Sequence, residues 1–244
     1  MVDPRVSIIE ERLKPVRKII AVSSGKGGVG KSLAASTLAL TLAKRGYKAG
    51  LFDLDFTSPS THVILGVEGV EPKEDKGIIP PQVHGIDYMS IVYYSGENAA
   101  PLRGADVSNA LIELLSITRW GELDFLIVDM PPGIGDATLD IIRLIKQVRF
   151  LVITTPSQLA FETVKKLANL LKDLKIQILG VIENMKMDNS SIIKQKVQGL
   201  SLPYLGEIPF DAGVEKAIGN VDELLSSNFA KKIDEIASKI VAGL

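Results

Sequence analysis

Cysteine is absent from the 244-residue sequence, and histidine occurs only as His62 and His84. Without thiolates, these residues cannot form disulfides, thiolate zinc sites or cysteine-ligated iron–sulfur clusters. Two isolated histidines are a weak basis for a metal site, and we interpret both as loop residues. We therefore expect no iron–sulfur cluster on this chain.

An excess of one charge and long hydrophobic runs are lacking too. The net charge is -1, so a global attraction to nucleic acid is not indicated. The longest apolar runs, such as residues 178–182, are far too short to cross a bilayer. The first five residues lack the apolar core of a signal peptide. We expect a cytoplasmic protein that binds neither nucleic acid nor membrane.

Strand patterns alternate with helical patterns along the chain. Hydrophobic spacing predicts strands over residues 18–24, 48–53, 86–91, 124–129, 150–154, 176–183 and 203–208. It predicts helices over residues 32–45, 105–118, 137–147, 160–174 and 221–241, and an irregular segment over 59–84. This alternation predicts an α/β fold with a mostly parallel twisted sheet and helices on both faces, formed by one domain over residues 1–244.

A phosphate-binding motif follows the first predicted strand and opens a helix. The segment Gly25-Lys26-Gly27-Gly28-Val29-Gly30-Lys31-Ser32 fits the P-loop pattern Gly-x-x-x-x-Gly-Lys-Ser. Its glycines let backbone N–H groups face phosphates, and the helix N-terminus adds positive potential. Lys31 is expected to reach the β and γ phosphates, and Ser32 to bind Mg²⁺. The motif predicts a Mg-dependent ATPase.

The loop resembles the deviant Walker A motif of the MinD/Mrp family of ATPases. The resemblance rests on the second lysine, Lys26, which in that family reaches the phosphates held by the other subunit of an ATP-dependent homodimer. A solvated loop lysine is the alternative interpretation. The family usually has Ser or Thr after the Mg²⁺ ligand, whereas this chain has Leu33, and the lost hydrogen bond should weaken nucleotide binding by about 1 kcal/mol.

Three acids at strand ends complete the expected site. Asp53 and Asp55 resemble the family's switch I, which implies that Asp55 orients the attacking water and that both lie near the Mg²⁺; a capping pair in a loop is the alternative. Asp129 ends an apolar strand of the Walker B type and is expected to hold Mg²⁺. Gly133, in a segment resembling switch II, is expected to present its N–H to the γ-phosphate. Asp136 is interpreted as a helix N-cap.

Two further segments are expected to bind the adenine base of the nucleotide. Asn184 lies in Glu183-Asn184-Met185, which resembles the family segment whose Asn contacts the adenine edge. Its spacing to Asp188 does not fit the GTPase motif, so we expect ATP and not GTP. The run Pro209-Phe210-Asp211 resembles the segment that lies against the base, although a core position for Phe210 is an equal alternative.

The resemblance runs from about residue 18 to residue 211 and is closest to the Mrp branch. Residues 102–104 and 119–124 look like stretches of that branch. Its cluster-binding Cys-x-x-Cys is absent, and a cysteine-free chain of this kind resembles the ATPase-type HypB proteins. That resemblance implies nickel delivery for [NiFe] hydrogenase maturation with a small HypA-like metallochaperone. The alternatives are an iron–sulfur cluster assembly factor of the Mrp type, a MinD/ParA-like positioning ATPase and a P-loop small-molecule kinase.

An amphipathic helix is expected at about residues 4–16, before the first strand. Val6, Ile9 and Leu13 lie at helical spacing on one face. Packing on the chain's own sheet is one interpretation of this face. The other is a docking site for the metallochaperone.

Overall fold

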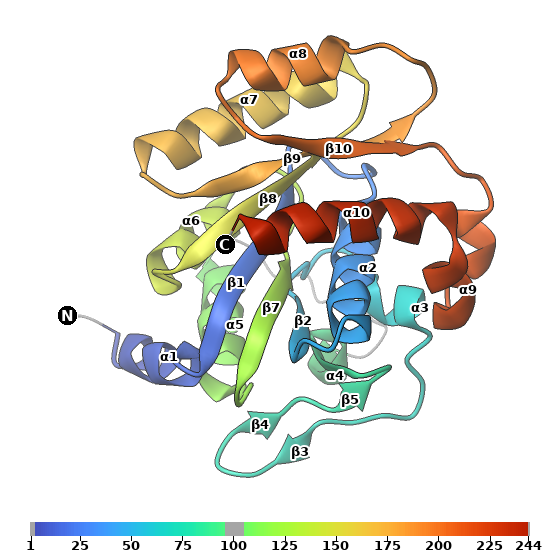
Figure 1. Ribbon diagram of the computed structural model, residues 1–244. Coiled ribbons are helices and arrows are strands. Elements are labelled where there is room, and N and C mark those ends of the chain that lie inside the picture. The colour runs from blue at the N-terminus through green and yellow to red at the C-terminus, as the bar shows by residue number, and fades with distance from the viewer. Residues whose placement is uncertain (1–2, 96–104, 244) are drawn as a thin grey trace.

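A computed structural model describes residues 3–95 and 105–243. Its main sheet has eight strands in the order β10-β9-β8-β1-β7-β2-β6-β5 (Figure 1). The strands are β1 (Val16–Ser24), β2 (Ala49–Asp53), β5 (Gln82–Val83), β6 (Ile86–Ser90), β7 (Leu123–Asp129), β8 (Val148–Thr154), β9 (Ile178–Lys186) and β10 (Tyr204–Pro209). Neighbouring strands are parallel except for the β5–β6 pair. The predicted α/β fold is confirmed.

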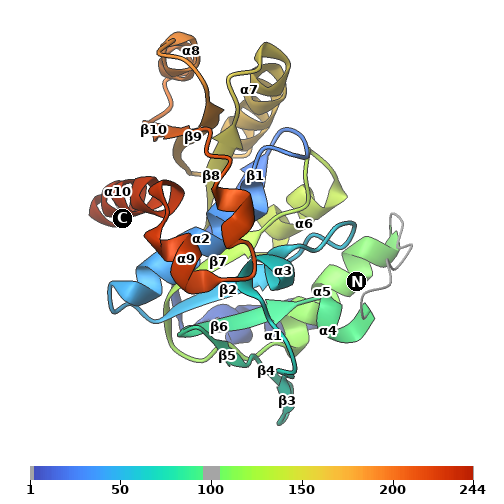
Figure 2. The same cartoon turned by 90° about the vertical axis from the view of Figure 1, so that its right-hand side faces the viewer.

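Helices cover both faces of this sheet because its buried strands present apolar residues to either side. One face packs against α2 (Lys31–Lys44), α3 (Thr61–Leu65), α9 (Val221–Ser226) and α10 (Asn228–Ala242). The other packs against α1 (Arg5–Leu13), α5 (Ala105–Ile117), α6 (Asp136–Leu144), α7 (Gln158–Asp173) and α8 (Ile192–Gly199). Figure 2 shows α2, α9 and α10 on one side of the central strands and α5 and α6 on the other.

Three segments differ from the sequence-based expectation. The predicted helix 221–241 is divided between α9 and α10, because Ser227 is extended and its Oγ accepts the N–H of Ala230 at 3.1 Å. The helix α8 was not expected, although Ile193 and Val197 are buried at helical spacing. The segment 59–84 holds α3, β5 and the two-stranded sheet of β3 (Lys73–Glu74) and β4 (Ile78–Ile79), while α4 (Val92–Ser95) follows β6. The Mrp-like stretch 102–104 lies outside the described residues.

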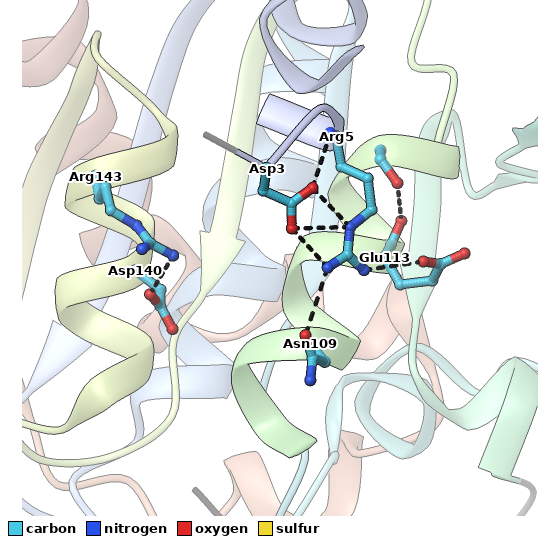
Figure 3. A network of polar contacts seen from close by, with 7 residues as sticks. Asp3, Arg5, Asn109, Glu113, Asp140 and Arg143 are labelled. Carbon is cyan, nitrogen blue, oxygen red and sulfur yellow. Dashed lines mark hydrogen bonds and ion pairs between the residues drawn. The ribbon is translucent and has the colours of Figure 1, made fainter. Parts of the chain in front are cut away.

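The N-terminal helix packs against the rest of the fold through its apolar stripe. Ile9 and Leu13 are buried in the core that includes α5. Arg5, held by Asp3, also reaches Asn109 and Glu113 on α5, each at 3.4 Å (Figure 3). Of the two interpretations of this helix, packing is therefore the one that the structure supports. The buried stripe is therefore not available as a docking surface for a metallochaperone.

Candidate nucleotide-binding site

The carboxyl ends of the central strands bring the predicted site together. In the parallel register Asp129 lies beside Asp53 on one neighbour and beside Val22 on the other. Strand β1 is flanked by β7 and β8, and its own helix α2 covers the opposite face from α6 and α7. Ligands of such sheets bind at the point where successive connections leave on opposite sides. The P-loop is at that point.

The backbone of the P-loop depends on two glycines. Gly28 and Gly30 have φ angles of 75° and 83°, a region that side chains other than glycine rarely adopt. Gly30 is the N-cap residue of α2, and Lys31 is its first residue. The N–H groups at this helix end therefore face the place where phosphates are expected.

Close packing fixes the position of the loop. A Cβ atom on Gly25 would lie 2.0 Å from the Oγ1 of Thr163 in α7. A Cβ atom on Gly30 would lie 2.3 Å from the Nδ2 of Asn184. Neither contact was expected from the sequence, since both join segments that are distant along the chain.

Buried charges surround the P-loop lysine. The Nζ of Lys31 is 2.6 Å from Oδ1 of Asp129 and 3.8 Å from Oδ2 of Asp55. Burial raises the pKa of Asp129, and the charge of Lys31 opposes this rise. Burial also raises the pKa of Asp53. Lys31 is thus paired with Asp129 and faces Asp55, while Asp53 lies beside Asp129 on the neighbouring strand.

The residues fit a magnesium ion. Among the described residues, Oδ2 of Asp129 is buried and has no hydrogen-bond partner. The Oγ of Ser32 is also close, since it accepts a hydrogen bond from Lys31 at 3.2 Å. Carboxylate and hydroxyl oxygens are ligands that Mg²⁺ prefers. Of the four predicted ligands, Asp129 and Ser32 thus have oxygens within hydrogen-bonding distance of the P-loop lysine.

Asp53 and Asp55 hold the switch I segment. Asp53 accepts the N–H of Asp55 at 3.0 Å and the hydroxyl of Thr61 at 2.6 Å. Oδ1 of Asp55 accepts hydrogen bonds from the hydroxyl of Thr57 at 2.7 Å and from the N–H of Ser58 at 3.1 Å. Both acids thus have the loop-capping contacts that were the alternative interpretation. Oδ2 of Asp55 nevertheless faces Lys31.

Switch II is joined to the end of β1. Gly133 has a φ of 86° and donates its N–H to the carbonyl of Ser24 at 3.0 Å. This N–H is therefore paired within the protein, although we expected it to face the γ-phosphate. Asp136 is not the N-cap that we expected, because the extended residue Gly135 takes that position and Asp136 begins the first turn of α6. A carboxylate there still interacts favourably with the helix dipole.

The residues that we expect at the base lie at the ends of β9 and β10. Asn184 is buried and donates its Nδ2 to the carbonyl of Val29 in the P-loop at 2.9 Å. Phe210 follows Pro209 and is 57% exposed, so the core interpretation of Phe210 is wrong. Asp211 accepts the N–H of Gly213 at 2.8 Å. The link from Asn184 to the P-loop was not expected.

The remaining predicted residues differ in exposure. Lys26 and Gly27 are exposed at the tip of the loop. Leu33 is half-buried and packs against the core on the α2 face. His84 is within 2.9 Å of the carbonyl of Leu65. In residues 3–95 and 105–243, no three His, Cys, Asp or Glu side chains form a metal-binding group, so a Mg²⁺ ion at Asp129 and Ser32 would need further ligands from the nucleotide and water.

Comparisons with known proteins agree with this geometry. The model of the NUBPL iron-transfer P-loop NTPases, of the ParA type, matches residues 15–244. An iron-sulfur cluster carrier protein of Saccharolobus solfataricus is 36% identical over 226 residues, which cover 86% of this chain and 76% of the relative. One of Pseudomonas fragi is 41% identical over 177 residues, which cover 71% of this chain and 62% of the relative.

Solved structures show the same fold. A nucleotide-binding protein from Archaeoglobus fulgidus in complex with ADP is 30% identical, with a TM-score of 0.76 over 90% of this chain and 92% of that one. The septum site-determining protein MinD of Pyrococcus horikoshii, complexed with Mg-ADP, has a TM-score of 0.69 at 24% identity, over 93% and 98% of the two chains. The MinD-like, P-loop ATPase fold is thereby confirmed, and the match to a P-loop NTPase family model supports the predicted ATP hydrolase activity.

The expected nickel function is wrong. The relatives at 36% and 41% identity are named iron-sulfur cluster carrier proteins, and none of the proteins reported above is a nickel-insertion protein. The resemblance to ATPase-type HypB and the expected HypA-like partner are therefore not supported either.

The chain spans only about 60% of the length of the first carrier proteins that it matches. In the described part of the chain, no helix has the length and apolar character to cross a membrane. With its family model matched from residue 15 to residue 244, the chain belongs to the NUBPL iron-transfer P-loop NTPases.

Proposed function

We propose that this chain is an ATP-driven switch in iron–sulfur cluster assembly and that cysteines outside these 244 residues hold the cluster. The family match and the names of the carrier proteins that resemble the chain support the assembly role. The chain has no cysteine, so its own side chains do not fit a cluster that needs thiolates. The cluster is thus cargo, and the 244 residues act as one nucleotide-dependent unit in the cytoplasm.

The nucleotide is held by the P-loop amides and Lys31. Since Lys31 is paired with Asp129 in the structure, the phosphates of ATP take over part of this pairing. Ser32 and Asp129 hold Mg²⁺, which neutralises phosphate charge when bound. Asp55, whose Oδ2 faces Lys31, orients the attacking water. The base lies between Asn184 and Phe210.

The switch consists of an exchange of partners at Gly133. Its N–H leaves the carbonyl of Ser24 for the γ-phosphate and returns when that phosphate is lost. Lys26 is exposed at the loop tip, where it is accessible to the phosphates of a second copy. A cation added there stabilises charge that develops during phosphoryl transfer. The active state is therefore an ATP-bound homodimer.

Anaerobic purification of the tagged chain from its own cells tests the assembly role. Iron, acid-labile sulfide and nickel are measured with a non-hydrolysable ATP analogue and with ADP, and Lys31→Ala is the matched control. We expect iron and sulfide to co-purify with a cysteine-containing protein in the ATP state and to be lost in Lys31→Ala. The isolated chain should stay colourless after reconstitution with iron and sulfide. Absence of iron and sulfide in both nucleotide states of the wild type contradicts the proposal.

A further inference from the structure

A cavity lies beside strand β6, outside the residues of the nucleotide-binding site. It is formed around α3, the segment after it, the end of β6 and the start of α4, and its volume is about 510 Å³. That size is within the range of small-molecule sites. Its lining includes Tyr88, Tyr93, Tyr94, Glu71 and Glu74. Nothing in the nucleotide chemistry uses these residues.

The lining of this tyrosine cavity suits an organic cation. Tyr88 and Tyr93 meet edge to face with ring centroids 5.9 Å apart, and Tyr94 is half-exposed beside them. Both glutamates are exposed at the surface, and the lining residues include neither lysine nor arginine. Aromatic rings and carboxylates together attract ammonium and guanidinium groups.

One phenol in the cavity also lacks a partner. The hydroxyl oxygen of Tyr93 is buried and forms no hydrogen bond with any described residue. Buried hydroxyl groups usually have a partner.

A chain of hydrogen bonds joins the cavity to switch I. The hydroxyl of Tyr88 is 2.9 Å from Oγ1 of Thr61, and that hydroxyl donates to Asp53 at 2.6 Å. Thr61 has one hydroxyl proton, so Tyr88 is the donor in the first contact. Asp53 in turn accepts the N–H of Asp55, whose carboxylate faces Lys31. A ligand that moves Tyr88 therefore acts on the segment that faces the phosphates.

We propose that the tyrosine cavity binds an ammonium or guanidinium cation and that this binding is coupled to the nucleotide site through Tyr88, Thr61 and Asp53. The cation belongs either to a free amine or to a lysine or arginine side chain of a partner. Coupling of this kind is reciprocal, so ATP changes the affinity for the cation by the same factor as the cation changes that for ATP. The inference is independent of the iron–sulfur role.

Calorimetry tests the binding with two free cations, agmatine and spermidine, and with a capped Gly-Arg-Gly peptide. We expect saturable binding of at least one probe. Affinity should fall at least tenfold in the Glu71→Gln, Glu74→Gln double variant and in Tyr94→Ala. The exposed Glu68, outside the lining, provides the control Glu68→Gln, which should bind as the wild type does. Binding of the peptide alone assigns the cation to a partner protein. Failure of all three probes overturns the proposal, as does equal affinity in the double variant.

Tyr88→Phe separates binding from coupling, because it keeps the ring and removes the hydroxyl. We expect this variant to bind the cation with wild-type affinity. The affinity of the wild type should change at least threefold when a non-hydrolysable ATP analogue is added, and that of Tyr88→Phe should not. An equal response to nucleotide in both proteins contradicts the hydrogen-bonded route.

Discussion

The contact between Asn184 and the P-loop gives the most specific prediction about the site. In the Asn184→Ala variant the carbonyl of Val29 loses a buried hydrogen bond of 2.9 Å. Loss of a partner for a buried polar group costs about 1–3 kcal/mol. We therefore expect the free energy of unfolding of the nucleotide-free variant to fall by about 1–3 kcal/mol, measured by urea denaturation. Asn189 is exposed, so Asn189→Ala is the matched control and should change stability by less than about 0.5 kcal/mol.

Nucleotide affinity separates the two roles of the same side chain. The amide of Asn184 has two N–H groups, so one can hold Val29 while the other contacts adenine. If the amide of Asn184 makes both contacts, calorimetry of Asn184→Ala should show ATP affinity reduced about tenfold, which corresponds to about 1.4 kcal/mol of binding free energy. Asn189→Ala should bind ATP normally. Identical denaturation curves for the two variants would refute the reasoning, because the link to the P-loop would then contribute nothing.

The other predictions concern the loop tip, the loop packing and pH. Lys26→Ala should bind ATP but lose hydrolysis by roughly 100-fold or more and lose the analogue-induced dimer in sedimentation; an unchanged dimer rejects the role in trans. Gly25→Ala forces a Cβ against Thr163 and should destabilise the protein by about 1–3 kcal/mol, whereas Gly27→Ala meets no atom within 4 Å and should unfold as the wild type does. Burial raises the pKa of Asp87, so its folded form binds protons more readily than its unfolded form and stability falls as pH rises above about 3.9. Asp87→Asn should therefore raise the Tm at pH 7 and lose this advantage below about pH 3.9; equal Tm values at pH 7 contradict the assignment.

Local patterns were sufficient for the P-loop and for most strands. The spacing from Gly25 to Ser32 follows an apolar strand and precedes a helix, so motif and context agree. The acids Asp53 and Asp129 could be placed together because parallel strands end at one edge. These inferences needed no tertiary contact.

Contacts between distant segments could not be predicted in this way. Asn184 and Val29 are 155 positions apart, and only the packing of β9 beside the P-loop joins them. The helical spacing of apolar residues continues through Ser227, and it therefore predicts one helix. The side chain of Ser227 caps a new helix instead, so the segment is divided in two. The nickel interpretation rested on a missing Cys-x-x-Cys. A missing motif supplies no residues from which the identity of another metal could be inferred.

The activity of cluster-containing enzymes in cells tests the central claim most directly. The chain is replaced by its Lys31→Ala variant, and the activity of an iron–sulfur dehydratase is compared with that of a cluster-free enzyme. We predict that the dehydratase loses activity at unchanged protein level and recovers it after reconstitution with iron and sulfide, while the cluster-free enzyme is unaffected. Full dehydratase activity in the Lys31→Ala cells would contradict a role of this ATPase in iron–sulfur cluster assembly.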